Sequence, residues 1–211
     1  MPDDTHAAVV EALRDALARP LPGLPTQLGM APQPRPGTER ILDPLLNCRR
    51  AAVLVLLYAR SGETHLVLTR RTEALENHRG QISFPGGSMD PGEDAVATAL
   101  REAQEELGID PRSLEILGQL SPLYIPPTDF CIYPVVAHTS GAPAFVPSEH
   151  EVAEVLEAPL RHLLAPATRC EETWDLRGEP VRVPYYAVGK HKVWGATAMV
   201  LCELLALLGE G

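Results

Sequence analysis

Apolar positions along the chain form runs and alternations that predict strands. The run from Ala51 to Tyr58 (AAVLVLLY) is typical of a buried strand. Residues His65 to Thr69 are predicted to form its hairpin partner, across a turn at Arg60–Glu63. Two further strands are predicted at Leu114–Leu120 and Cys131–His138, with a proline-rich loop between them. Together these segments predict a sheet.

Helical spacing of apolar residues appears towards both ends of the chain. Residues 5–18 predict a short helix, and Trp194–Leu208 predicts a closing apolar helix. The stretch Pro20–Pro44 is predicted to be an extended arm, because proline cannot continue a helix or join a central strand. Val152–Leu164 could hold a turn or a short helix. Strands and helices mixed in this order predict an α/β sandwich built on a mixed sheet.

The best-defined predicted helix begins at Asp90. Asp90 is expected to be its N-cap, with Pro91 at the first helical position and Glu93 three residues after the cap. Gly108 is expected to end the helix. The predicted helix therefore covers DPGEDAVATALREAQEELG.

Composition narrows the class of protein. The 211 residues, 45% of them hydrophobic, suit one domain at residues 41–211, preceded by a helix and arm at residues 1–40. A net charge of −10 disfavours binding to a nucleic-acid backbone, so no nucleic-acid partner is expected. The N-terminus lacks a signal-peptide pattern, and no apolar run reaches the roughly 20 residues of a membrane span. We expect a cytoplasmic protein with no membrane partner, and leave a homodimer open.

Four cysteines, Cys48, Cys131, Cys170 and Cys202, lie far apart without a CxxC pair. This spacing indicates neither a zinc site nor a disulfide framework. We expect reduced, buried thiols.

Three glutamates, Glu102, Glu105 and Glu106, share one face of the predicted helix because they stand at positions i, i+3 and i+4. Their repulsion calls for a compensating positive charge, which Arg101 supplies in part. Mg²⁺ prefers oxygen ligands and is held by one or two carboxylates together with substrate phosphates. A solvated helix face is the alternative. The glycines of the preceding FPGG turn, residues 84–87, allow close approach of backbone to a ligand or metal, which favours a phosphate-processing site.

The spacing from Gly87 to Ile109 resembles the 23-residue Nudix box, GX5EX7REUXEEXGU. The chain matches it at every fixed position, and only Ala103 is smaller than the usual bulky aliphatic residue. The resemblance implies an α/β/α sandwich. It also implies a loop-helix-loop metal site and hydrolysis of a nucleoside diphosphate linked to another moiety.

The resemblance also implies roles for individual residues. By position, Glu102 and Glu106 would be the principal metal ligands, with Glu105 a further ligand or base. The Gly87 carbonyl would contribute to the metal site. The residues implied to orient the loop and the helix are Glu93 and Arg101.

The segment just upstream, VLTRRTEALENHRGQISFPGG, resembles the coenzyme A pyrophosphatase motif LLTXR(S/T)X3RX3GX3FPGG. Later segments are similar to the same subfamily, so the resemblance covers roughly residues 41–205. It implies coenzyme A or a derivative as substrate, with 3',5'-ADP and 4'-phosphopantetheine as products. Val67 replaces a Leu, and Glu76 stands where the motif has Arg. ADP-ribose or another nucleoside diphosphate derivative is therefore the alternative substrate.

Other polar residues are weaker candidates. Arg70 and Arg71 end a strand and could bind substrate phosphates, although alternation along the strand would point one of them away. His78 could contact substrate or be structural. Glu151 and Glu154 could each supply the general base or be solvated.

The expected mechanism is attack of water on one phosphorus of a pyrophosphate. Mg²⁺ or Mn²⁺ would polarise the phosphoryl oxygens and lower the pKa of the attacking water. The alternative from another class is a Nudix-fold module that binds a small-molecule nucleotide without hydrolysing it. Such modules commonly lose box carboxylates, and none is missing here.

Overall fold

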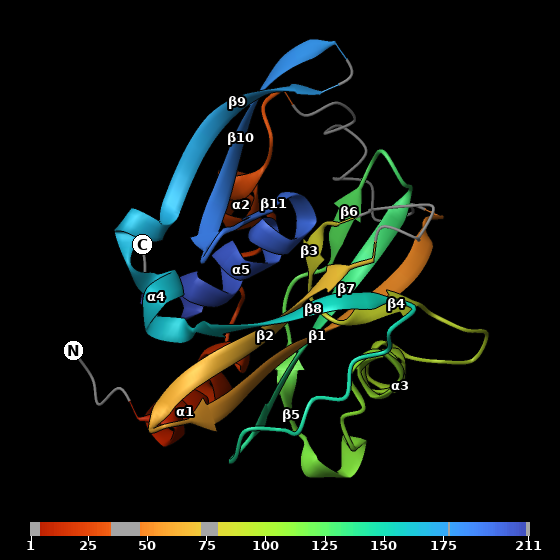
Figure 1. Cartoon of the computed structure of the whole chain (residues 1–211), viewed down its shortest axis with the longest axis vertical. Coiled ribbons are helices and arrows are strands. Elements are labelled where there is room, and N and C mark those ends of the chain that lie inside the picture. Colours follow the sequence, from red (N-terminus) through yellow and green to blue (C-terminus); the bar gives the residue numbers. More distant parts are fainter. Residues whose placement is uncertain (1–4, 35–46, 73–79, 177, 210–211) are drawn as a thin grey trace.

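The computed structural model describes residues 5–34, 47–72, 80–176 and 178–209. Its elements form a central sheet, a smaller sheet and surrounding helices (Figure 1). The central sheet contains β1 (Arg49–Arg60), β2 (Glu63–Arg71), β3 (Ile82–Ser83), β4 (Gly86–Ser88), β5 (Glu115–Gln119), β6 (Leu123–Ile125), β7 (Phe130–Thr139) and β8 (Val152–Pro159). The smaller sheet contains β9 (Arg169–Leu176), β10 (Glu179–Val188) and β11 (His191–Trp194). The helices are α1 (His6–Leu17), α2 (Gly23–Gln27), α3 (Ala95–Leu107), α4 (Leu160–Leu164) and α5 (Gly195–Leu207).

The central sheet is mixed, as expected. β1 runs parallel to β7 along its length, whereas its pairings with β2 and β4 are antiparallel. The predicted hairpin is confirmed, but β1 and β2 pair only between Leu57–Arg60 and Glu63–Leu66. Beyond that point the two strands diverge, and β4 pairs with β1 while β3 pairs with β2. The glycine-rich turn after Phe84 therefore lies in the fork between β1 and β2.

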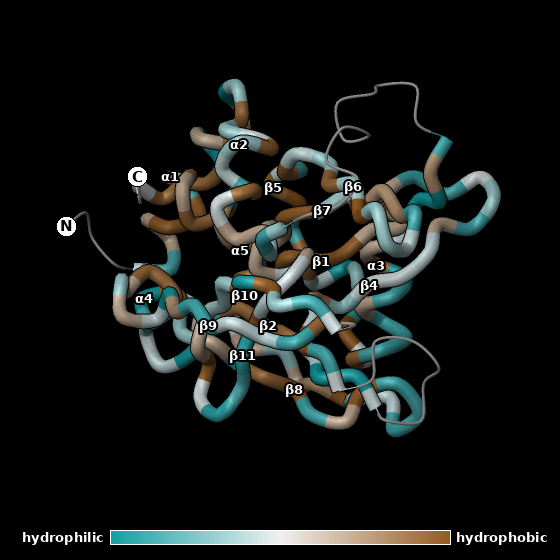
Figure 2. Tube along the Cα trace, turned by 90° about the horizontal axis from the view of Figure 1, so that it is seen from above, coloured by the Kyte–Doolittle hydropathy of each residue, from teal (hydrophilic) through white to brown (hydrophobic). Residues whose placement is uncertain are grey.

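Alternation along β1 explains the layers. Ala52, Leu54 and Leu56 point to the face covered by α3, and Val55 and Leu57 point to the opposite face. That opposite face is covered by α5, α1 and the segment around α2. Figure 2 shows the apolar central strands enclosed by more polar loops. The predicted α/β/α sandwich is confirmed.

The helix predicted from Asp90 begins later than expected. Asp94 is its N-cap, and the Asp94 carboxylate accepts a hydrogen bond from the Ala97 amide at 2.8 Å. Gly92, with φ of +91°, closes a separate turn in which the Glu93 carboxylate accepts from the Asp90 amide. The predicted C-terminus is correct, because Gly108 caps α3 in the left-handed conformation with φ of +67°.

Three expectations about local structure were wrong or incomplete. The expected arm after residue 20 contains the short helix α2, whose proline lies within its first turn, where no amide donor is needed. Val152–Leu164 is mostly strand, β8, followed by the short α4. The smaller sheet, β9–β11, was not predicted, because β9 alternates half-buried with exposed side chains that are mostly polar.

The expectation of four reduced cysteines was also wrong. Cys48 and Cys131 form a disulfide, with their Cα atoms 5.8 Å apart. The parallel pairing of β1 with β7 brings together two residues separated by 83 positions in sequence. Cys170 and Cys202 are free and partly buried. None of the described helices is long and apolar enough to cross a bilayer.

Candidate functional site

The two glycines of the sheet fork bring backbone against the acidic helix. A Cβ atom on Gly86 would lie 2.4 Å from the Ala52 carbonyl oxygen, so only glycine fits against β1. A Cβ atom on Gly87 would lie 2.3 Å from Oε1 of Glu102. The absence of a side chain at Gly87 therefore leaves the space that the Glu102 carboxylate occupies.

Arg101 joins the loop to the helix through a hub of hydrogen bonds. Its Nε and Nη2 donate to the two Glu93 oxygens at 2.8 and 3.0 Å, and Nη2 also donates to the Ser88 carbonyl at 3.1 Å. Its Nη1 donates to Glu102 at 2.8 Å and to Glu105 at 3.0 Å. Arg101 thus fixes the orientation of two helix carboxylates relative to the loop.

Glu93 is the anionic centre of this hub. Hydrogen bonds from Arg101, from the Thr98 hydroxyl at 2.7 Å and from the Asp90 amide lower its pKa to about 2. Glu93 therefore stays ionised, and the loop and the start of α3 are held together by charge-assisted hydrogen bonds. Thr98, in the first turn of α3 and five residues after Glu93, was not among the predicted site residues.

Glu106 is the buried carboxylate of the site. Its side chain is only 2% exposed, and its Oε1 lies 3.4 Å from Nη1 of Arg71. Its Oε2 has no hydrogen-bond partner among the described residues. The pKa of Glu106 is raised to about 8, chiefly by burial; Arg71 and the Gly86 amide oppose this shift, whereas the charges of Glu102 and Glu151 add to it. A buried carboxylate oxygen without a partner is costly unless a cation or donor reaches it.

Glu102 lies beside Glu106 and shares part of its environment. Burial raises the pKa of Glu102, Arg101 lowers it, and the charges of Glu105 and Glu151 raise it again. The pKa values of both carboxylates are raised, so each is harder to ionise than usual. A divalent cation bound between them would stabilise their charged forms. Glu105 differs from both, because its side chain is 57% exposed and is paired with Arg101 as expected from its spacing.

These residues fit a hard cation such as Mg²⁺. The donor set is oxygen only, from Glu102, Glu106 and the nearby backbone of Gly87, and Mg²⁺ needs few protein ligands because it keeps several waters. Within the part of the chain that the structure describes, no three acidic, histidine or cysteine side chains already converge as a complete cage. The arrangement therefore suits a metal shared with substrate phosphates.

The loop after residue 145 positions Glu151 against the site. The amides of Val146 and Ser148 donate to the C-terminal carbonyls of α3, those of Leu107 and Glu106, each at 2.8 Å. The last carbonyl groups of a helix have no partner within the helix, so these bonds satisfy two of them and fix the loop to the end of α3. The charge of Glu151 raises the pKa of Glu102 and Glu106, so its carboxylate lies within electrostatic range of both.

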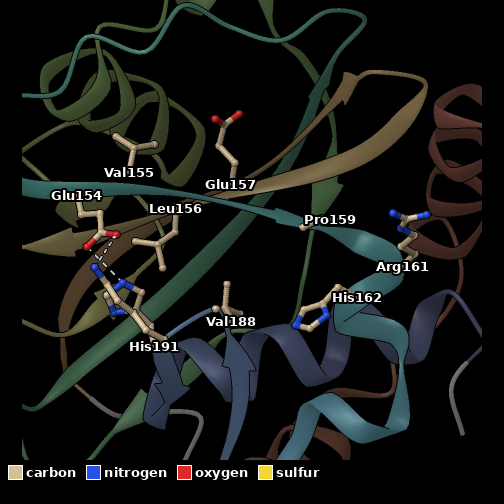
Figure 3. A pocket seen from close by; sticks show the side chains of 11 residues that line it. Glu154, Val155, Leu156, Glu157, Pro159, Arg161, His162, Val188 and His191 are labelled. Carbon is tan, nitrogen blue, oxygen red and sulfur yellow. Dashed lines mark ion pairs between the residues drawn. The ribbon is translucent and has the colours of Figure 1, made fainter.

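Strand alternation separates the two arginines that end β2. Arg71 contacts Glu106, whereas Nε of Arg70 lies 3.2 Å from Oε2 of Glu154 on β8. Glu154 also pairs with His191 and Lys190 at 3.2 and 3.6 Å, along a cavity of about 820 Å³ (Figure 3). These ion pairs, with His191 contributing most, lower the pKa of Glu154. The structure thus brings Arg71, and not Arg70, to the buried carboxylate.

Two predicted positions fall on residues that the structure does not describe. His78, a candidate for substrate contact, and Glu76, the departure from the motif, both lie in residues 73–79. Trp194, at the start of the predicted closing helix, contacts Trp174 edge-to-face with ring centroids 5.1 Å apart.

Comparison with known proteins finds similar sequences and a similar fold. A family model described as the NUDIX domain matches residues 49–174. The uncharacterized Nudix hydrolase NudL of Photorhabdus laumondii is 36% identical over 179 residues, covering 84% of this chain and 91% of that protein. The mitochondrial coenzyme A diphosphatase NUDT8 of Homo sapiens is 39% identical over 167 residues, covering 76% of this chain and 70% of that protein.

A solved structure, the MutT/nudix family protein from Enterococcus faecalis, is similar in fold. Its TM-score is 0.50 at 17% sequence identity, covering 77% of this chain and 68% of that chain.

Proposed function

Since the chain belongs to the Nudix hydrolase family, a family of pyrophosphatases, we propose that it hydrolyses coenzyme A or a coenzyme A derivative. The products would be 3',5'-ADP and 4'-phosphopantetheine. The observation that carries the assignment of a hydrolytic site is the buried Oε2 of Glu106, which has no hydrogen-bond partner among the described residues and lies beside Glu102 and Arg71. The substrate assignment is supported by the upstream motif and by the name of the human relative.

Nudix hydrolases use divalent cations, and we propose that Mg²⁺ or Mn²⁺ serves here. Glu102 and Glu106 would hold the ion, with the Gly87 carbonyl and Glu105 as further contributors. When bound, the ion would polarise the phosphoryl oxygens and lower the pKa of the attacking water.

The chain's own residues would position the substrate and move the proton. Arg71, beside Glu106, would donate hydrogen bonds to a substrate phosphate. Arg101 and Glu93 would hold the carboxylates of α3 in a fixed position relative to the glycine-rich loop. Water would form a bond to one phosphorus as the bridging P–O bond breaks. The proton of this water would pass to Glu151, which follows the loop fixed to the end of α3 and whose charge raises the pKa of Glu106. Glu105 is the alternative proton acceptor.

Glu76 gives a specific reason for an alternative substrate. The coenzyme A motif has Arg at this position, and the opposite charge would weaken contact with a phosphate there. ADP-ribose lacks the 3'-phosphate of coenzyme A and would be less affected. Arg70 and His78 remain candidates for substrate contact. A module that binds nucleotides without hydrolysis is less well supported, since all box carboxylates are retained.

A substrate panel tests the proposal. Coenzyme A, acetyl-coenzyme A, ADP-ribose and a dinucleoside polyphosphate would be compared by kcat/KM with saturating Mg²⁺, with products separated by chromatography. We expect coenzyme A or its thioester to give the highest kcat/KM and to release 3',5'-ADP. Higher kcat/KM for ADP-ribose would replace the substrate assignment, and no hydrolysis of any compound would overturn the catalytic one.

Several expectations stay predictions. They are the separate arm at residues 1–40, the single domain at residues 41–211, a cytoplasmic location and a homodimer.

A further inference from the structure

A pair of histidines joins the N-terminal helix to the central sheet. His6 opens α1, and His138 lies near the end of β7. Their ring centroids are 5.6 Å apart, and the ring planes are inclined by 50°. Helix α1 covers the sheet face opposite α3, with its buried Leu13 in the same core cluster as α5 (Figure 1). The pair therefore lies on the other side of the sheet from the carboxylate site.

Each ring uses one nitrogen in a hydrogen bond with a described side chain. Nδ1 of His6 is 3.2 Å from the Thr64 hydroxyl, and Nε2 of His138 is 3.0 Å from a carboxylate oxygen of Glu115. Arg14 on α1 holds the other oxygen of Glu115 at 2.8 Å. The remaining nitrogens, Nε2 of His6 and Nδ1 of His138, are buried and make no hydrogen bond of normal geometry with the described residues, although the Thr139 carbonyl lies near the His6 ring.

This pattern is the one expected of metal-binding imidazoles. A histidine ligand binds the ion through one nitrogen, while the other donates to a carboxylate or another acceptor that fixes the ring. With Zn–N distances of about 2.0–2.1 Å, two imidazoles on one tetrahedral ion have ring centres roughly 5–6 Å apart. The observed separation of 5.6 Å lies in that range.

The surroundings of His6 favour the neutral form of its ring. Burial and the neighbouring His138 lower the pKa of His6, against a smaller raising effect of the Thr139 carbonyl. A neutral imidazole has a lone pair free for coordination.

We propose that His6 and His138 bind one divalent transition-metal ion, of which Zn²⁺ is the reference case. Imidazole nitrogen suits Zn²⁺, Cu²⁺ and Ni²⁺, whereas the oxygen ligands of the other face suit Mg²⁺. Water completes the coordination, because no group of three ligating side chains occurs among the described residues. The ion crosslinks α1 to β7 and stabilises the docking of the N-terminal helix on the sheet.

The direct test is a long-range ¹H–¹⁵N spectrum of the histidine side chains in the full-length protein, recorded during addition of ZnCl₂ with excess Mg²⁺. We expect the resonances of His6 Nε2 and His138 Nδ1 to shift together and saturate at one equivalent. Zn²⁺ that leaves both resonances unmoved would overturn the proposal, and this readout does not depend on any variant folding.

Thermal unfolding provides the second test. At about 100 times its dissociation constant, Zn²⁺ is expected to raise Tm by roughly 5–10 °C. The rise should be lost in His138→Ala and in His6→Ala, and retained in the control His150→Ala, which removes an exposed histidine. It should also persist in the Glu102→Gln/Glu106→Gln double variant, which removes the carboxylate site. An undiminished rise in His138→Ala, or loss of the rise in the double variant alone, would contradict the two-histidine site.

Discussion

Two buried glutamates in this molecule lie in opposite environments. Glu203 on α5 is fully buried, and its carboxylate accepts three hydrogen bonds, from the amides of Gly23 and Ser121 and from Nε2 of Gln27. Glu106 on α3 is almost as buried, but Arg71 lies 3.4 Å from one oxygen, the other has no hydrogen-bond partner among the described residues, and Arg71 and the Gly86 amide together do not offset the burial.

The difference separates a structural carboxylate from one that is prepared for a ligand. Glu203 ties the segment around α2 and the loop after β5 to α5, and its hydrogen bonds replace those lost from water. Glu106 lacks that compensation, so its stabilisation must come from a proton or from a bound cation. Burial alone is therefore not evidence of function, whereas burial with an unpaired oxygen beside a second carboxylate is.

The largest predicted effect is the loss of catalysis in Glu106→Gln. A bound metal contributes several kcal/mol of transition-state stabilisation, so kcat should fall by roughly 100- to 1,000-fold. The fold should survive, because the amide is isosteric and no longer carries a buried charge. Turnover of coenzyme A or ADP-ribose at subsaturating Mg²⁺, together with circular dichroism, would check both statements. Near-normal kcat would remove Glu106 from the metal site.

Glu203→Gln is expected to affect stability and not catalysis. The amide replaces an acceptor with a donor facing three donors, so the free energy of unfolding should fall by about 3 kcal/mol. Urea unfolding would measure the loss, and kcat per folded molecule should stay within about twofold of wild type. A large fall in kcat with unchanged stability would show that Glu203 serves catalysis, and would contradict its structural role.

The pH dependence of stability should differ between wild type and Glu106→Gln when metal is removed. The pKa of Glu106 is about 8 in the folded protein, above its unfolded value, so the folded state holds the proton more tightly. Its contribution is fully present below about pH 4.5 and is lost as pH rises through about 8. Between pH 5 and 8, metal-free wild type should lose on the order of 2–3 kcal/mol relative to Glu106→Gln. Parallel pH profiles by urea unfolding with EDTA would contradict this.

The smallest expected effect is that of Gly87→Ala. Its Cβ would lie 2.3 Å from the Glu102 carboxylate, which must then move. Because the substitution moves the Glu102 carboxylate without removing it, we expect metal affinity to fall roughly 10-fold. Gly141→Ala is the matched control, because open space surrounds a Cβ there. Equal Mg²⁺ dependence of kcat in the two variants would show that Gly87 does not set the position of Glu102.

The sequence was most informative where function depends on local spacing. The positions of Glu102, Glu105 and Arg101 on one helix predict their proximity, and the structure contains the predicted Arg101–Glu105 pair. The strand pattern of β1 likewise predicts a buried central strand, because alternation and length are local properties. Gly108 ends α3 for the same reason.

Features that depend on distant segments could not be predicted in the same way. Glu203 stands out within an apolar run, but its partners come from positions 23, 27 and 121. The disulfide requires the register of β1 on β7, which no local pattern provides. The start of α3 was misplaced because Asp90 and Asp94 both carry capping side chains, and Gly92 turns the chain between them.

Direct measurement of Mn²⁺ binding would show whether the Glu106 carboxylate binds a cation. Electron paramagnetic resonance would follow free Mn²⁺ during titration of wild type, Glu106→Gln and Glu203→Gln at one ionic strength, without substrate. We expect Glu106→Gln to bind Mn²⁺ at least about 10-fold more weakly than wild type, and folded Glu203→Gln to keep wild-type affinity. Equal affinities for wild type and Glu106→Gln would contradict this expectation.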